Sequence, residues 1–204
     1  MRNEPDILDL LDQLDSVVAD ELEGQDLDFK EWKGSLDHMV KLVVEMAVCM
    51  ANGGGGTVVF GVADKVKGRN TAVRGVPPEI DVNRLKKAVY DTTDPKLTPV
   101  FEEIRVPEGT GRLLAMQIFP GMPPYTDTSG RAKIRIGKDC NPLTGTLRKK
   151  LMVETGESDV SAELVDSAWQ ALVSPTAMEA LRARARAEGA PRALRALAGG
   201  GFGA

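Results

Sequence analysis

The amino-acid sequence predicts an α/β (α+β) fold, a mixed β-sheet flanked by helices with helical extensions at both ends. Three observations lead to this prediction. An almost wholly apolar segment runs from about residue 35 to 52, and the short apolar run TVVFGV follows it after four glycines. Two strand-like segments are joined by the hairpin connection PEGTG. After about residue 150 the pattern is purely helical.

The chain divides into three parts by composition and periodicity. Residues 1–22 are expected to contain an amphipathic helix over about residues 5–22, because apolar side chains recur every three or four positions and aspartates fill the other face. Residues 23–150 hold the expected α/β domain. Residues 151–204 are expected to be a helical extension, with helices over SAELVDSAWQALV and SPTAMEALRARARAEG.

The first half of the α/β domain reads as a strand, a helix and a second strand. In GQDLDFKEWK, Leu27 and Phe29 alternate with polar residues, which is the period of a half-buried strand. Ser35 is a suitable N-cap for a central, buried helix that ends near Asn52. The run TVVFGV is typical of a strand that is covered on both faces.

The second half of the domain adds one helix and three strands. Asp81 can cap a helix over residues 81–92. In AKIRIGKD, Ile134 and Ile136 fall on one face of a strand, and Lys133 and Arg135 on the other. The three strands are expected in PVFEEIRV, RLLAMQIFP and AKIRIGKD.

The glycine run Gly53–Gly56 resembles a phosphate-binding loop only at first sight. Phosphate loops lie between a strand and the helix that follows it, and a Walker loop also has Lys after its last glycine. Here the order is helix then strand, Thr57 follows the glycines, and a helix C-terminus is unfavourable for an anion. We therefore expect Asn52 and Gly53 to form a left-handed C-cap, the other glycines to reverse the chain, and no nucleotide cofactor to bind there.

Composition narrows the class of protein. The 204 residues carry a formal net charge of −4, and a dedicated nucleic-acid binder is usually basic, but bases cluster locally at residues 131–138 and 148–150. No apolar run reaches the roughly 18–20 residues that span a bilayer, and the N-terminus lacks the features of a signal peptide. We expect a cytoplasmic protein that does not associate with membranes.

The sequence argues against a zinc site. It contains a single histidine, His38, and its two cysteines, Cys49 and Cys140, are far apart and form no CxxC pair.

Several short motifs in a fixed order resemble the Schlafen AlbA_2 domain family over about residues 20–150. They are Glu23, DFK from Asp28 to Lys30, AVCMANGGGGTVVFGVAD from Ala47 to Asp64, Gly68 with Gly75, and IRIG from Ile134 to Gly137. The resemblance implies a mixed sheet flanked by helices and a role in nucleic-acid biology. It also implies that residues 151–204 lead into a further C-terminal region and that a single-lobed chain forms a homodimer.

Within this family, some members resemble metal-dependent endoribonucleases that act on structured RNA such as tRNA, and others are described as DNA-binding regulatory modules. The resemblance to the nucleases implies that Glu23, Asp28 and Asp64 form a catalytic metal centre for Mg²⁺ or Mn²⁺. Such ions take oxygen ligands and can activate a nucleophile next to a phosphate. Basic side chains are expected to hold the phosphates of the nucleic acid, namely Lys30, Lys33, Lys133, Arg135 and Lys138.

Two points leave alternatives open at this stage. The family's EFK is DFK here, so Asp28 is one methylene shorter than the family's glutamate; the change is either conservative or marks a member that binds without cutting. The three acids also have ordinary structural interpretations, as a helix end, a solvated strand face and a turn. A non-catalytic DNA-binding regulatory module and a bare dimerisation or interaction domain are therefore the alternatives to the nuclease.

Overall fold

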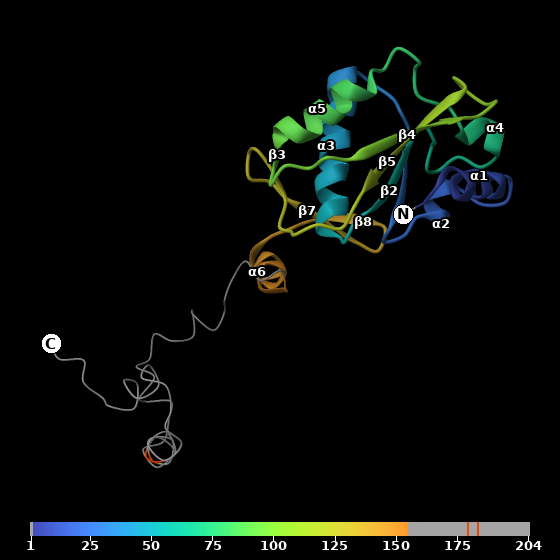
Figure 1. The fold of residues 1–204 in the computed structure, drawn as a ribbon. Coiled ribbons are helices and arrows are strands. Elements are labelled where there is room, and N and C mark those ends of the chain that lie inside the picture. Colours follow the sequence, from blue (N-terminus) through green and yellow to red (C-terminus); the bar gives the residue numbers. More distant parts are fainter. Residues whose placement is uncertain (1, 155–178, 180–182, 184–204) are drawn as a thin grey trace. The chain divides into compact units, whose positions relative to one another are not determined.

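The computed structural model describes residues 2–154 together with 179 and 183. The chain forms two compact units, Met1–Glu157 and Ser158–Ala204. The first unit contains every strand described below (Figure 1). In the second unit, Glu179 and Ala183 are helical. The two helices predicted between residues 161 and 189 otherwise lie outside the described residues.

A four-stranded mixed sheet forms the centre of the first unit, as predicted. Its strand order is β1–β2–β5–β4. Strand β1 pairs parallel with β2, which pairs antiparallel with β5, and β5 pairs antiparallel with β4. The parallel pair is joined by helix α3, so the first two strands form a βαβ unit. The bounds are β1 Leu27–Lys30, α3 Leu36–Asn52, β2 Gly56–Phe60, β4 Val100–Arg105 and β5 Arg112–Ile118.

Helices cover both faces of the sheet and give two hydrophobic clusters. Helices α3 and α5 (Val82–Thr92) pack on one face, and Val58 and Phe60 of β2 belong to that cluster. Val59 points into the opposite cluster, with α1 and Leu27 and Phe29 of β1. The expectation of a strand covered on both faces is therefore confirmed. The second face carries α1 Glu4–Asp12, the 3₁₀ turn Gln13–Asp15, α2 Ala19–Leu22 and α4 Arg69–Ala72.

The N-terminal helix is shorter than predicted, because the chain leaves the helix after Asp15. Gly68 donates its backbone N–H to the carbonyl of Leu14, and Arg69 donates its own to the carboxylate of Asp15, at 2.8 and 2.9 Å. These tertiary bonds replace the helical continuation, which resumes at Ala19 as the short α2. The apolar stripe is still used, since Ile7, Leu11 and Leu14 are fully buried.

The glycine run reverses the chain between α3 and β2, but its left-handed part begins one residue later than predicted. Gly53 caps the helix with φ −87°, and the first positive φ is that of Gly54, +97°. Gly55 is the crowded position: it has φ +89°, and a Cβ there would lie 2.7 Å from the carbonyl oxygen of Ile118. The glycines therefore let the loop pass directly against β5.

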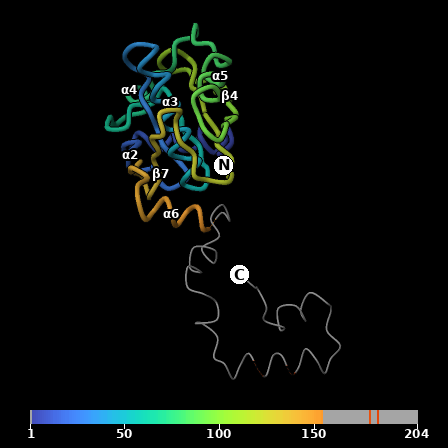
Figure 2. Tube along the Cα trace, turned by 90° about the vertical axis from the view of Figure 1, so that its left-hand side faces the viewer, coloured from blue at the N-terminus to red at the C-terminus, as the bar shows by residue number. Residues whose placement is uncertain are grey.

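Two small sheets and a helix complete the unit. Strand β3 pairs with β6, and β7 pairs with β8 as a hairpin that lies against α3 (Figures 1 and 2). The predicted single strand over residues 132–139 is therefore wrong in extent, because the chain turns at Gly137, where φ is +62°. Helix α6 contains residue 150, the predicted domain boundary. The bounds are β3 Thr93–Asp94, β6 Thr126–Asp127, β7 Lys133–Ile136, β8 Asp139–Pro142 and α6 Gly145–Glu154.

Within residues 2–154 and the two further described positions, no helix is long and apolar enough to cross a membrane.

Candidate functional site

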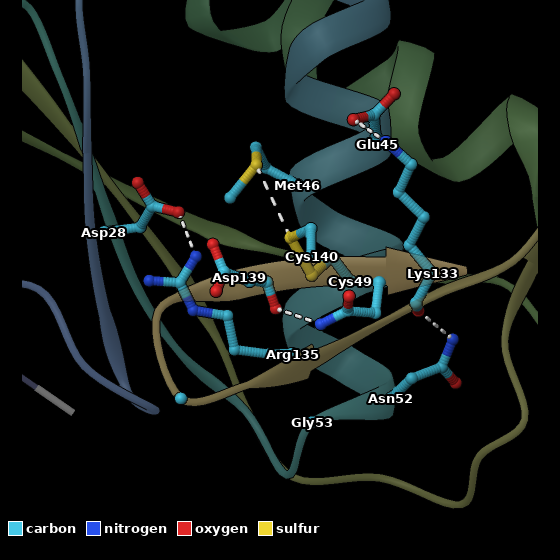
Figure 3. Close-up of a disulfide and its surroundings, with 12 residues drawn as sticks. Asp28, Glu45, Met46, Cys49, Asn52, Gly53, Lys133, Arg135, Asp139 and Cys140 are labelled. Carbon is cyan, nitrogen blue, oxygen red and sulfur yellow. Dashed lines mark hydrogen bonds and ion pairs between the residues drawn. A yellow bond between two sulfur atoms is a disulfide. The ribbon is translucent and has the colours of Figure 1, made fainter. Parts of the chain in front are cut away.

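A buried ion pair joins β1 to the β7–β8 hairpin. Asp28 is 1 % exposed and Arg135 is 2 % exposed, and one guanidinium nitrogen of Arg135 donates to Oδ2 of Asp28 (Figure 3). Leu27 and Phe29 point into the cluster on the α1 side, so Asp28 projects from the other face of the edge strand. The hairpin covers that face, and the alternative interpretation of Asp28 as part of a solvated strand face is therefore wrong.

Arg135 is held by backbone groups as well as by Asp28. Its Nε donates to the carbonyl of Gly24 at 3.1 Å, and its Nη2 donates to the carbonyl of Leu27 at 2.9 Å. The amide of Gln25 contacts the hairpin from the same loop: it donates to the carbonyl of Arg135 at 2.9 Å and accepts from the N–H of Gly137 at 2.8 Å. Arg135, predicted to contact phosphate, thus fixes the hairpin to the domain instead of facing solvent.

Glu23 lies next to Asp28 at the end of α2. Its Oε1 accepts the backbone N–H of Phe29 at 3.1 Å and lies 3.9 Å from Nζ of Lys30. The pKa of Glu23 is raised to about 7, mainly because the side chain is buried and secondly because the negative charge of Asp28 lies nearby. The nearby charge of Lys30 acts in the opposite direction. Glu23 therefore changes its charge near neutral pH.

The three predicted acids line one charged pocket of about 250 Å³ between the end of β2, α3 and the hairpin. Asp64 follows β2, and no hydrogen bond or ion pair engages its carboxylate among the described residues. Its backbone carbonyl accepts from the N–H of Asp20 at 2.9 Å. Basic side chains share the pocket with these acids, namely Lys30, Lys65, Arg135 and Lys138.

The arrangement does not fit a divalent cation as it stands. Each carboxylate oxygen of Asp28 already contacts a cationic side chain, Lys30 at Oδ1 and Arg135 at Oδ2. In the part of the chain that the structure describes, no group of three His, Cys, Asp or Glu side chains is placed to hold a metal ion. The Mg²⁺ or Mn²⁺ centre of Glu23, Asp28 and Asp64 remains a prediction.

All five bases predicted to contact phosphate make ion pairs. Lys30 pairs with Asp28, and Arg135 does the same from the opposite side. The others pair at the surface: Lys33 with Glu31 at 2.8 Å, Lys133 with Glu45 at 2.5 Å, and Lys138 with Asp20. The pKa of Asp20 is lowered and that of Lys138 is raised, in both cases mainly by the hydrogen bond between the two side chains.

Residues that sequence reasoning missed position the hairpin from α3. Asn52, 3 % exposed, donates its amide N–H groups to the carbonyls of Tyr125 and Lys133 at 2.9 and 2.8 Å, and its Oδ1 accepts from the N–H of Tyr125 at 2.7 Å. Cys49 and Cys140, which form no spacing motif, are joined by a disulfide between α3 and β8 (Figure 3). For Asn52, the available signal in the sequence was an Asn at the end of an apolar helix. For the disulfide, the sequence contains no spacing motif that indicates the pairing.

The hairpin belongs to a strongly basic stretch of sequence. Residues 131–150 carry seven Lys or Arg and a single acid, Asp139. These positions cover β7, β8 and most of α6. Lys149 and Lys150 are exposed on α6, and the side chain of Arg131 is 84 % exposed. We refer to residues 131–150 as the basic segment.

Comparison with known proteins shows which solved structures and which family the chain resembles. The crystal structure of protein DIP2311 from Corynebacterium diphtheriae is 24 % identical with a TM-score of 0.50, covering 67 % of this chain and 28 % of that one. A solution structure of the N-terminal domain of a DNA helicase RecG-related protein from Nitrosomonas europaea is 22 % identical with a TM-score of 0.40, covering 63 % and 82 %. None of the curated proteins matches significantly. The model of the family Schlafen, AlbA_2 matches residues 23–144. Since this match spans more than half of the sequence, the chain belongs to the Schlafen AlbA_2 family of nucleic-acid-related domains.

Proposed function

We propose that the chain is a nucleic-acid-binding module, in which the basic segment contacts the phosphate backbone and the buried acids Glu23 and Asp28 hold the fold together. The observation that carries the proposal is the charge of residues 131–150, seven bases against one acid in a chain of net charge −4. Lys and Arg contacts with phosphates supply most of the sequence-independent affinity for nucleic acids. The bases are spread over three consecutive elements, β7, β8 and α6, and those of α6 include the exposed Lys149 and Lys150.

The surface ion pairs of the hairpin are compatible with phosphate binding. The side chains of Lys133 and Lys138 are 38 % and 46 % exposed, and their partners Glu45 and Asp20 are 46 % and 32 % exposed. Pairs of this kind contribute only about 0–1 kcal/mol. A phosphate oxygen can therefore replace the carboxylate at little cost. Arg135 is different, because its guanidinium is buried and serves to position the hairpin.

Fluorescence anisotropy with labelled duplex DNA and duplex RNA of equal length, in EDTA, tests the proposal. The wild-type affinity should fall linearly with salt on logarithmic axes. Lys138→Gln and Lys149→Gln should each weaken binding by about three- to tenfold and reduce the salt slope by about 1. Lys87→Gln is the matched control, because Lys87 is an exposed lysine on α5 that pairs with Asp91 outside the basic segment. Binding that is unchanged by the first two substitutions would overturn the proposal.

A metal-dependent endoribonuclease is the second candidate, and a specific observation favours it. Glu23, Asp28 and Asp64 line the same pocket, and the carboxylate of Asp64 has no hydrogen-bond or ion-pair partner among the described residues. For these three residues to hold Mg²⁺ or Mn²⁺, Asp28 would have to exchange Lys30 or Arg135 for the ion. The ion would then supply charge neutralisation at the phosphate.

Incubation with tRNA and Mn²⁺ or Mg²⁺ separates the two candidates. Asp64→Asn is the informative variant. In the described part of the chain, the Asp64 carboxylate makes no hydrogen bond or ion pair, so its replacement should leave the fold intact. Cleavage by the wild type that disappears in Asp64→Asn supports the nuclease. Binding without cleavage, equal in both proteins, supports the module.

The homodimer and the cytoplasmic location remain predictions. Light scattering of the purified chain checks the first, and twice the mass of 21.9 kDa is the expected result.

A further inference from the structure

A disulfide lies beside the proposed site and joins the hairpin to the centre of the domain. Cys49 belongs to α3 and is fully buried, whereas Cys140 belongs to β8 and is partly exposed. Their Cα atoms are 5.9 Å apart and 91 positions separate them in the sequence. Cys140 also lines the charged pocket, together with Asp28 and Arg135 (Figure 3). Cys49 is therefore enclosed by the core, and Cys140 is a partly exposed residue at the wall of the pocket.

The noncovalent bonds that attach the hairpin to the domain come mainly from β7 and the turn after it. Strands β7 and β8 form a separate two-stranded sheet, and neither is paired with the four-stranded sheet. In β7 and its turn, Arg135 bonds to Asp28, Gly24 and Leu27. Asn52 and Gln25 bond to backbone groups of the same stretch, and Lys133 and Lys138 pair with surface acids. From β8, Sγ of Cys140 lies 4.0 Å from Sδ of Met46. The disulfide is the one covalent link between the hairpin and α3 in the described chain. Without the disulfide, β8 keeps its pairing with β7 and the contact of Cys140 with Met46, and a strand attached in this way opens more readily than β7.

We propose that the Cys49–Cys140 pair is a redox control of the nucleic-acid site, which rests on the function proposed above. With the disulfide closed, Lys133, Lys138 and the start of the basic segment are fixed against α3. With the disulfide open, the hairpin fluctuates, its basic side chains lose their common arrangement, and the affinity for nucleic acid falls.

The chemistry of opening follows from the different exposure of the two cysteine residues. A thiolate of a dithiol reductant attacks Sγ of Cys140 from the pocket, the S–S bond breaks, and Cys49 leaves as a thiolate that takes up a proton. The second thiol of the reductant then attacks the mixed disulfide, which releases Cys140. The protein gains two electrons and two protons, and the dithiol becomes a disulfide. An oxidised dithiol or diamide reverses the reaction.

Hydrogen exchange measured by mass spectrometry tests the structural part, with the full chain after treatment with diamide or with dithiothreitol. Reduction should speed exchange in residues 133–142 by about tenfold or more, and leave the central strand β5 unchanged as an internal control. Cys140→Ser should match the reduced wild type under both conditions. Cys140 is the better position for this change, because Ser at the buried Cys49 would place a hydroxyl in the core. Exchange that is the same in both states, or two thiols that persist after diamide, would overturn the proposal.

Anisotropy with the same labelled duplexes tests the functional part. Reduction should weaken binding by about five- to tenfold and lower the salt slope, and dithiothreitol should have no effect on Cys140→Ser. Faster exchange with unchanged affinity would overturn the control of binding while leaving the proposed function intact. No binding in either state, with exchange still dependent on the disulfide, would instead contradict the proposed function and with it the regulatory role.

Discussion

Arg135 of β7 and Asp28 of β1 form an ion pair across 107 positions of sequence, and both side chains are almost fully buried. The pair lies where the hairpin covers the edge strand of the main sheet. A buried charge that loses its partner is strongly destabilising. The pair therefore connects the stability of the domain to the placement of its basic surface.

Substitution of Arg135 by Gln should lower the free energy of unfolding by about 3–5 kcal/mol, because it leaves Asp28 buried with Lys30 as its only remaining cationic partner. Urea denaturation monitored by circular dichroism measures this loss. Lys138→Gln is the control, since its surface pair with Asp20 should change stability by no more than about 0.5 kcal/mol. Equal, small effects of the two substitutions would show that the buried pair does not hold the hairpin.

Glu23 should make the stability of the domain depend on pH. Its pKa is raised from 4.5 to about 7 in the folded state, so the folded protein binds the proton more tightly than the unfolded chain. The stabilisation is present in full below pH 4.5 and is lost as the pH rises through about 7. Glu23→Gln keeps an acceptor for the N–H of Phe29 and removes the titration.

The measurement is the unfolding free energy of Glu23→Gln and of the wild type at pH 5 and pH 8. The variant should gain about 1–3 kcal/mol relative to the wild type between these two values, because only the wild type buries a carboxylate at pH 8. A difference that is constant with pH would contradict the raised pKa.

Gly55 and Gly54 offer a matched test of the chain reversal after α3. Both have positive φ, but a Cβ at Gly54 meets nothing within 4 Å, while one at Gly55 lies 2.7 Å from the carbonyl oxygen of Ile118. Gly54→Ala should cost about 1–2 kcal/mol for the left-handed backbone alone. Gly55→Ala should cost clearly more, because the loop must also move away from β5. Thermal or urea unfolding measures the loss of unfolding free energy in each variant. The same loss in both would mean that the close approach of Gly55 to Ile118 does not affect stability.

Asp20 should compete with nucleic acid for Lys138, because the two side chains are paired at the surface of the hairpin. Asp20→Asn removes one negative charge next to the basic segment and frees the ammonium group. Its affinity for duplex nucleic acid should rise by about two- to fivefold at low salt, and the gain should shrink at high salt. Asp37→Asn on α3 is the control, as Asp37 is an exposed acid that pairs with Arg84. A loss of affinity in Asp20→Asn would contradict this competition.

The sequence was sufficient for the elements whose pattern is local. The buried helix with its N-cap at Ser35, the helix capped by Asp81 and the strand covered on both faces were predicted from periodicity and capping. The motifs around Glu23 and Asp64 also identified the family before the fold was known.

The parts that failed depend on contacts between distant segments. The alternation around Asp28 was compatible with a solvated strand face as well as with a metal ligand. Nothing nearby in the sequence indicates that a hairpin more than a hundred residues later covers this side chain. The burial of Arg135, which was expected to hold a phosphate, depends on the same distant pairing. The disulfide joins positions without a spacing motif, and the break after Asp15 follows from bonds to Gly68 and Arg69. Tertiary partners override local pattern in each case.

The central claim is that the basic segment binds nucleic acid while the neighbouring acids are structural. The most direct measurement is the affinity of the wild type and of Lys149→Gln for duplex DNA and duplex RNA over a range of salt concentrations, in EDTA and in Mn²⁺. The account predicts binding in EDTA that weakens with salt, is reduced in Lys149→Gln, and gains nothing from Mn²⁺. Binding that requires Mn²⁺, accompanied by cleavage and insensitive to Lys149→Gln, would contradict it.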